Sequence, residues 1–245
     1  MRSTLLALLA LLALFAASLA CTAAAGDPSP PAARGPVLLE LFTSQGCSSC
    51  PPADRVLARL AAEGQHGGKQ VLGLSFHVDY WNDLGWKDPY SSPQWTHRQH
   101  QYAAALGDAR VYTPELVVGG AAGMVGSNVT SITSAIAKAR APALLPATAA
   151  WSKDAVEITT SAPLDADVYV AIYETARTNK VPRGENSGTT SAHTNVVRRL
   201  ERIALAGQQN TIKLAVDAAW RDVGAVVFAQ RPDKHIVASA AIPRR

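Results

Sequence analysis

Residues 37–52 read VLLELFTSQGCSSCPP, and this stretch carries the strongest indication of fold and chemistry in the chain. An apolar run typical of a buried β-strand precedes a short polar turn and two cysteines, Cys47 and Cys50. Pro51 and Pro52 then open a helical pattern, where proline is favoured. Thiols at this spacing can close a small disulfide ring, and the amides at a helix start favour a thiolate. The stretch therefore predicts a redox-active pair.

Two other interpretations of the cysteine pair stay open. It could be an inert structural disulfide, or it could be half of a metal site. Metal-binding pairs of this spacing usually need a second pair or nearby histidines. No second pair follows, although His77, His97 and His100 could supply a ligand, as in a protein that carries soft copper. We predict no metal ligand and no cofactor.

The elements expected after this strand follow the order β-α-β-α-β-β-α between residues 37 and 140. Helical patterns cover residues 51–63 and 93–106, and Ser127 and Asn128 cap a last helix. Apolar runs typical of strands cover residues 37–42, 71–78, 111–118 and 121–125. A strand, a cysteine pair and a helix in this order predict a thioredoxin-like α/β domain.

A change of pattern follows residues 141–150, which we interpret as a linker. Short alternating runs then predict a small all-β sandwich-like domain over residues 151–245. The expected strands cover residues 155–160, 167–173, 195–205, 211–216, 225–230 and 235–240, with a polar loop over 179–191.

The first residues have the pattern of an export signal. Met1-Arg2-Ser3 precedes a run of Leu and Ala, and small residues follow it. We predict a signal peptide over residues 1–25, a linker over 26–36 and a periplasmic or secreted location, with no transmembrane span after cleavage. Cys21 resembles a lipidated cysteine and is a possible lipid anchor. Export would place the cysteine pair in an oxidising compartment.

Composition argues against a nucleic-acid binder. The chain has 245 residues, a formal net charge of +4 and no run of Lys or Arg. We therefore expect no nucleic-acid partner.

Thr113-Pro114 stands where the third strand of a thioredoxin-like domain begins. Thioredoxin-like folds have a cis-proline at this place, packed against the disulfide, and the residue before it offers its backbone to an extended substrate. We predict that Thr113 and Pro114 contact substrate. An ordinary strand-opening proline is the alternative.

Aromatic residues are concentrated between residues 76 and 102, and they include Trp81 and Trp86. They form either an apolar wall that binds substrate beside the dithiol or the packing of a helical insertion. Asp79 and Asp83 are in the same stretch. A carboxylate near the pair could accept a proton from the second thiol, or could serve as a turn or cap residue.

Several strings resemble one family of secreted bacterial thioredoxin-like proteins of unassigned function, the domain of unknown function 1223. They are ELFTSQGCSSCPPAD at residues 40–54, FHVDYW at 76–81, LGW at 84–86, YTP at 112–114, GENSG at 184–188 and HTNVVR at 193–198. The resemblance implies fold and export without supplying a reaction. Unlike thioredoxin itself, the chain has Gly46 in place of a tryptophan and Ser48-Ser49 between the cysteines.

A polar cluster is expected in the second domain, formed by Arg183, Glu185, Asn186, His193 and Arg198. Charge-assisted hydrogen bonds from it could tie the loop to a strand or to the first domain. The alternative is a site for a ligand or a partner.

The leading hypothesis is an exported thiol–disulfide oxidoreductase. Cys47, exposed at the helix start, would attack, and Cys50 would be the buried resolving thiol. Thr113, Pro114, Trp81 and Trp86 would contact a protein or small-thiol disulfide substrate, and an unknown redox partner would restore the pair. A non-catalytic binding module with a structural disulfide is the alternative from another class.

Overall fold

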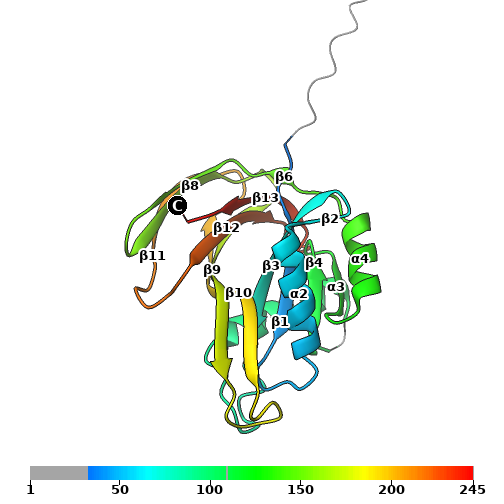
Figure 1. The fold of residues 1–245 in the computed structure, drawn as a ribbon. Helices are drawn as coiled ribbons and strands as arrows, with labels where there is room; N and C mark the ends of the chain where they lie inside the picture. Colours follow the sequence, from blue (N-terminus) through cyan, green and yellow to red (C-terminus); the bar gives the residue numbers. More distant parts are fainter. Residues whose placement is uncertain (1–32, 109, 245) are drawn as a thin grey trace, which may run out of the picture. The chain divides into compact units, whose positions relative to one another are not determined.

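A large mixed β-sheet organises the structure (Figure 1). The computed structural model describes residues 33–108 and 110–244. Within them ten strands form one sheet in the order β5-β4-β1-β3-β10-β9-β12-β13-β6, with β2 paired to β3. These strands are β1 (Val37–Thr43), β2 (Gln65–His66), β3 (Lys69–His77), β4 (Glu115–Val118), β5 (Ala122–Val125), β6 (Ala143–Leu144), β9 (Asp167–Lys180), β10 (Thr190–Ala204), β12 (Val223–Gln230) and β13 (Ile236–Ile242).

Strands β1 and β3 run parallel, joined through helix α2 (Pro51–Glu63). All seven residues of β1 are buried, as expected for a parallel strand covered on both faces. Helix α2 begins with prolines and ends at Gly64, whose φ of 63° is the left-handed conformation that glycine adopts at helix ends.

The other two helices of the described residues have side-chain caps. In α3 (Pro93–Leu106) the Ser92 side chain accepts from the Gln94 amide, and in α4 (Val129–Lys138) Asn128 accepts from the Ser131 amide. These helices start and end close to the predicted residues, because their caps and stops are local signals.

The large sheet is covered on both faces. One face packs against α3 through Phe42, Phe76, Trp95 and Tyr102, and the opposite face of β1 packs against α2 and α4 through Leu39, Leu57 and Ile132. A second sheet packs onto the C-terminal strands; its described strands are β7 (Ala147–Trp151), β8 (Ala155–Ser161) and β11 (Gln209–Ala215).

The predicted fold class is wrong. The chain is not a thioredoxin-like α/β domain followed by a small all-β sandwich-like domain, because the later strands extend the first sheet. Strand β10 pairs in parallel with β3, with Val196 opposite Ser75, and β9, β12 and β13 follow. Residue Ala33 onward forms one compact unit, and part of the expected linker is strand β6.

Side-chain contacts reinforce the junction between β3 and β10. The Ser75 hydroxyl donates to the Thr194 carbonyl at 2.7 Å, and the Asn195 amide donates to the Gly73 carbonyl at 2.8 Å. Asn195 has a φ of 49°, a conformation that Asn tolerates better than most residues. Local sequence patterns could not reveal this pairing, since its partners are about 120 residues apart.

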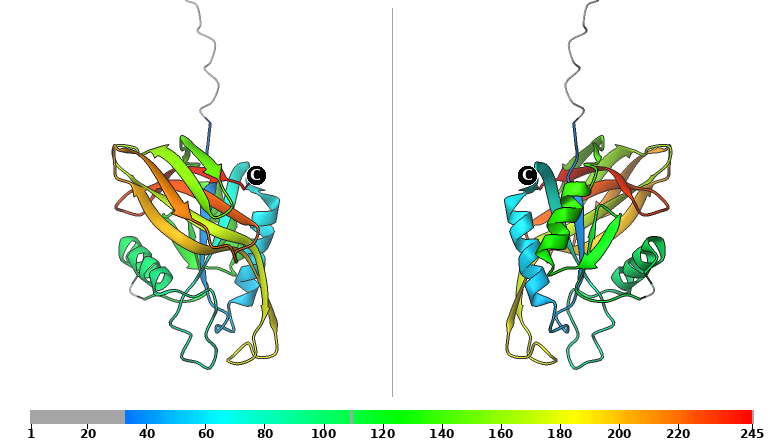
Figure 2. Two further views of the ribbon diagram at one scale, coloured as in Figure 1. Left: turned by 90° about the vertical axis from the view of Figure 1, so that its left-hand side faces the viewer. Right: turned by 90° about the vertical axis from the view of Figure 1, so that its right-hand side faces the viewer.

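Strands β9 and β10 form a hairpin that projects beyond the sheet. The pairing of β9 with β12 ends at Glu174, while β9 and β10 stay paired to Lys180 and Thr190. Figures 1 and 2 show the tip of this hairpin beside the segment that follows β1. The loop is shorter than predicted and covers residues 181–189.

Among the described residues, no helix is long and apolar enough to span a membrane. The predicted signal peptide and Cys21 lie outside the described residues, as does most of the predicted linker over 26–36.

Candidate functional site

Cys47 and Cys50 form a disulfide between the end of β1 and the start of α2. Cys50 is the residue that precedes the helix, and its carbonyl accepts from the amides of Ala53 and Asp54. The predicted position of the pair at a helix start is therefore correct. The helix amides and dipole face this end of the ring, where they favour negative charge.

Both cysteines are 0% exposed, although Ser48 and Ser49 between them are exposed. The expectation that Cys47 is exposed is therefore wrong. The physical reason is packing from remote segments: the Asn186 amide donates to the carbonyls of Gln45 and Cys47, both at 2.9 Å. Any reagent that reaches the sulfurs needs these segments to move.

Gly46 allows a second segment to approach the ring. A Cβ atom on Gly46 would lie 3.0 Å from the Trp81 Cβ, closer than ordinary contacts allow. The position at which thioredoxin has a tryptophan is thus filled here from outside by the backbone and Cβ of Trp81.

Thr113 and Pro114 lie beside the exposed part of the ring. The bond between them is cis, as predicted. The Thr113 carbonyl accepts from the Ser49 hydroxyl at 3.4 Å. Pro114 itself is buried at the start of β4. A substrate role for these residues stays a prediction.

Trp81 and Trp86 anchor the turn-rich segment between β3 and α3. The Trp81 indole donates to the Thr113 hydroxyl at 2.8 Å, and the Trp86 indole donates to the Gln45 side chain at 3.0 Å. Both rings are partly buried. They hold neighbouring loops together, and their predicted contact with substrate is untested.

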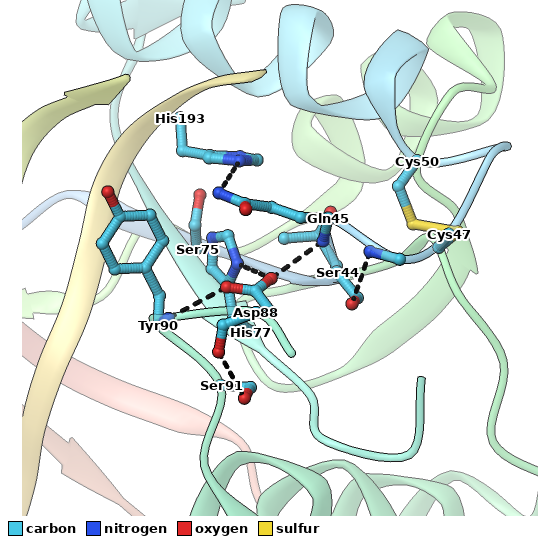
Figure 3. A network of polar contacts seen from close by, with 12 residues as sticks. Ser44, Gln45, Cys47, Cys50, Ser75, His77, Asp88, Tyr90, Ser91 and His193 are labelled. Atoms are coloured by element: carbon cyan, nitrogen blue, oxygen red, sulfur yellow. Dashed lines mark hydrogen bonds and ion pairs between the residues drawn. A yellow bond between two sulfur atoms is a disulfide. The ribbon is translucent and has the colours of Figure 1, made fainter. Parts of the chain in front are cut away.

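A buried polar network lies behind the ring (Figure 3). Asp88 accepts from the Gln45 amide at 2.8 Å and contacts His77 Nδ1 at 2.7 Å. Gln45 Nε2 contacts His193 Nε2 at 3.2 Å. His193 Nδ1 lies 3.6 Å from the carboxylate of Asp54, which also accepts from the Thr43 hydroxyl at 3.0 Å. The network joins β1, β3, α2 and β10.

The imidazole rings of His77 and His193 pack against each other in this network, and in the described part of the chain each has a buried ring nitrogen without a hydrogen bond. Their rings are perpendicular, with centroids 4.5 Å apart. Neither His77 Nε2 nor His193 Nδ1 has a hydrogen-bond partner among the described residues. Burial alone would raise the pKa of Asp88, but His77 and the amides of Gln45 and Tyr90 lower it below 3.8. The site can therefore keep a buried carboxylate charged beside two imidazoles.

No group of three or more His, Cys, Asp and Glu residues within 33–108 and 110–244 is arranged to hold a metal ion. His97 and His100 are exposed on α3. The copper alternative thus lacks a ligand cluster in this part of the chain.

Sequence reasoning missed Gln45, Asp54 and Asp88 as members of the site. Asp88 follows an aromatic stretch and precedes a proline, a pattern typical of a turn. The two aspartates that were proposed instead are not in the network: Asp79 accepts from the Thr96 hydroxyl, and Asp83 is exposed. The contacts of Glu185, Asn186 and His193 fit the structural interpretation of the predicted polar cluster. The other two predicted members lie apart from these contacts, because Arg198 pairs with Glu174 and Arg183 is exposed.

The chain belongs to the family described as protein of unknown function (DUF1223), whose sequence model matches residues 38–230. It is similar to the crystal structure of a structural-genomics target protein from Agrobacterium tumefaciens, with 31% identity and a TM-score of 0.68, over 86% of this chain and 95% of that one. HBP35 of Porphyromonas gingivalis shares the fold at 14% identity and a TM-score of 0.56, over 86% of this chain and 75% of that one. The comparison with curated proteins found no match.

Proposed function

We propose that this protein is an exported thiol–disulfide oxidoreductase that acts in the periplasm or outside the cell. The observation that carries the proposal is the Cys47–Cys50 disulfide at the start of α2, next to a buried network of imidazoles and carboxylates. The helix start favours a thiolate at Cys47, and the network offers groups that can hold a proton.

The reaction needs only the two thiols and a substrate disulfide. In the reduced protein the Cys47 thiolate attacks one substrate sulfur, so that the substrate S–S bond breaks and one substrate thiolate leaves. The Cys50 thiolate then attacks the Cys47 sulfur of the mixed disulfide. The second substrate thiol leaves, and the Cys47–Cys50 bond forms again. A dithiol partner must supply the two electrons that restore the reduced pair.

The residues that we propose for contact with substrate are Thr113, Pro114, Trp81 and Trp86. The Thr113 carbonyl is close to the exposed Ser49, where an extended peptide could take its hydrogen bond. Trp81 holds the Thr113 side chain, and Trp86 holds Gln45. We propose that a protein or small-thiol disulfide binds along this edge.

One observation favours the binding-module alternative, in which the disulfide is structural: both cysteines are fully buried. The reduction potential separates the two functions. A potential below about −300 mV indicates a structural bridge, while a higher potential indicates a pair that exchanges.

The test is trapping with a small disulfide such as oxidised glutathione. Reduced Cys50→Ser should accumulate a mixed disulfide at Cys47, because the resolving thiol is gone, whereas Cys47→Ser should not. Glu157→Gln, a change of an exposed carboxylate on β8, is the control and should exchange like the native protein. Absence of exchange in the folded native protein at a potential below about −300 mV would instead establish the structural role.

Export is tested separately. Fractionation of cells with an intact envelope should recover the protein outside the cytoplasm, with its N-terminus within residues 21–26. A mature chain that begins with a lipid-modified Cys21 would identify a membrane anchor, and an intact Met1 on a cytoplasmic protein would contradict export.

A further inference from the structure

The loop between β9 and β10 lies across the cysteine pair, and we call residues 181–189 the cover loop. Glu185 Oε2 accepts from the Ser48 amide at 3.1 Å. Asn186 donates to the carbonyls of Gln45 and Cys47. Three hydrogen bonds from two adjacent residues thus dock the loop on the Gln45–Ser48 segment.

The cover loop is also bonded to itself. The Thr189 hydroxyl donates to the Asn186 carbonyl at 2.7 Å, and the Gly188 amide donates to the Val181 carbonyl at 2.8 Å. Gly184, with a φ of 78°, packs against Trp86; a Cβ there would lie 3.2 Å from the Trp86 Cβ. The internal bonds do not involve the Gln45–Ser48 segment, so they would be kept if the loop moved away from that segment.

The Glu185 carboxylate and a Cys47 thiolate would be two negative charges close together beside the start of α2. The start of α2 favours one negative charge, and in the oxidised protein the Glu185 carboxylate takes the amide of Ser48, the residue next to Cys47. The hydrogen bonds from Ser48 lower the pKa of the exposed Glu185 carboxyl, as expected for an ionised acceptor. Reduction would place a second negative charge beside it, and like charges at this range repel.

We propose that the cover loop is a redox-sensitive gate: Glu185 and Asn186 close it over the oxidised pair, and reduction of Cys47–Cys50 opens it. This proposal rests on the proposed function, since the gate acts only if the pair is reduced in the working protein. It also explains how Cys47, which is buried in the oxidised protein, could reach an external disulfide once the pair is reduced.

The step that opens the gate is a balanced thiol–disulfide exchange. A small dithiol gives up two electrons and two protons and becomes a cyclic disulfide. The Cys47–Cys50 bond breaks, Cys50 becomes a thiol, and Cys47 becomes a thiol or releases its proton to solvent as a thiolate. Since closing stabilises the oxidised protein, anything that weakens closing must favour reduction by the same factor.

The experiment uses the full chain with two variants of the cover loop and two controls. Glu185→Gln keeps the shape and removes the charge, and Asn186→Ala removes the two bonds to the carbonyls. Arg183→Gln changes an exposed charge within the same loop, and Glu157→Gln removes an exposed carboxylate on β8. Dithiothreitol is the probe. The rate at which dithiothreitol reduces the Cys47–Cys50 disulfide is followed by alkylation and mass mapping. The equilibrium constant of this exchange gives the reduction potential of the pair.

The two loop variants should be reduced about tenfold faster than the native protein and the controls, and their equilibrium should shift about tenfold toward the dithiol, which is about 30 mV for this two-electron couple. Hydrogen exchange of the Ser48 amide should accelerate when the native protein is reduced.

Two other outcomes are informative. If both variants are reduced at the rate of the native protein, and Ser48 hydrogen exchange is equal in both redox states, the gate is overturned. Faster reduction of the variants together with no trapping by Cys50→Ser would retain the gate and overturn the oxidoreductase.

Discussion

At the scale of single residues, Gln45 connects the cysteine pair to the rest of the molecule. Its side chain bonds to Trp86, Asn179 and His193, and its backbone bonds to Asp88 and Asn186. This residue is 1% exposed, so almost every polar group it carries is satisfied within the protein. The position of the turn before Cys47 thus depends on four other segments of the chain.

Asp88 gives a stability prediction. It is buried, it accepts from two amides, and its pKa is lowered below 3.8. Asp88→Asn should therefore cost about 1.5–3 kcal/mol of unfolding free energy at pH 7, because it removes the charged acceptor of two buried amides. Denaturant unfolding measures this, and Asp83→Asn, an exposed change in the same segment, should cost almost nothing.

The lowered pKa of Asp88 also predicts how the stability difference between the native protein and Asp88→Asn depends on pH. A carboxyl with a lowered folded pKa stabilises the protein fully above its unfolded pKa, and the stabilisation is lost as the pH falls through the folded value. The gap between the native protein and Asp88→Asn should thus be constant from pH 7 to about pH 5 and shrink at lower pH. A gap that does not shrink at low pH would contradict the assignment of a charged Asp88.

At the scale of elements, helix α3 is fixed to the middle of the sheet by a buried ion pair. Arg98 donates to both oxygens of Glu40 on β1, at 2.6 and 2.9 Å, and Tyr102 donates to the same carboxylate. Phe42 and Phe76 surround this pair with apolar surface. The pair sets which face of α3 meets the sheet, and α3 in turn supports the segment that carries Trp81 and Asp88.

A double-mutant cycle tests this docking. Glu40→Leu and Arg98→Met should each cost about 3–5 kcal/mol, since each leaves a buried charge without its partner. The double variant should cost less than either single one, because no charge then remains buried. The exposed pair Arg59–Glu63 on α2 is the comparison and should contribute under about 1 kcal/mol. Additive costs at Glu40 and Arg98 would show that the two side chains act independently.

At the scale of the whole molecule, one sheet runs from β5 to β6 through strands from both halves of the chain. The core on the α3 face contains Phe42 and Phe76 from the first half and Val197 and Phe228 from the second. The cysteine pair and the turn before it, which belong to the first half, also contact the second half. Asn186 in the loop of the β9–β10 hairpin donates to the Cys47 carbonyl, and His193 on β10 contacts Gln45. The site exists only when the halves are joined.

This arrangement predicts a single unfolding transition. Single-tryptophan variants that retain Trp95 in α3 or Trp151 in strand β7 of the second sheet should report the same denaturant midpoint, because the core between the halves is shared. Fluorescence against denaturant concentration measures both midpoints, with far-UV circular dichroism as the reference. Two separate midpoints would instead support independent domains on either side of residues 141–150, the boundary predicted from the sequence.

Features with local causes could be predicted from the amino-acid sequence. The cysteine spacing, the prolines at the helix starts, the caps at Ser92 and Asn128 and the stop at Gly64 each act within a few residues, so their positions could be predicted. Long-range packing is responsible for the pairing of β10 with β3, the burial of Cys47 and the contact of His77 with His193. These contacts join segments far apart in the chain. Their free energy depends on surfaces that exist only after folding, and no local pattern of residues specifies it.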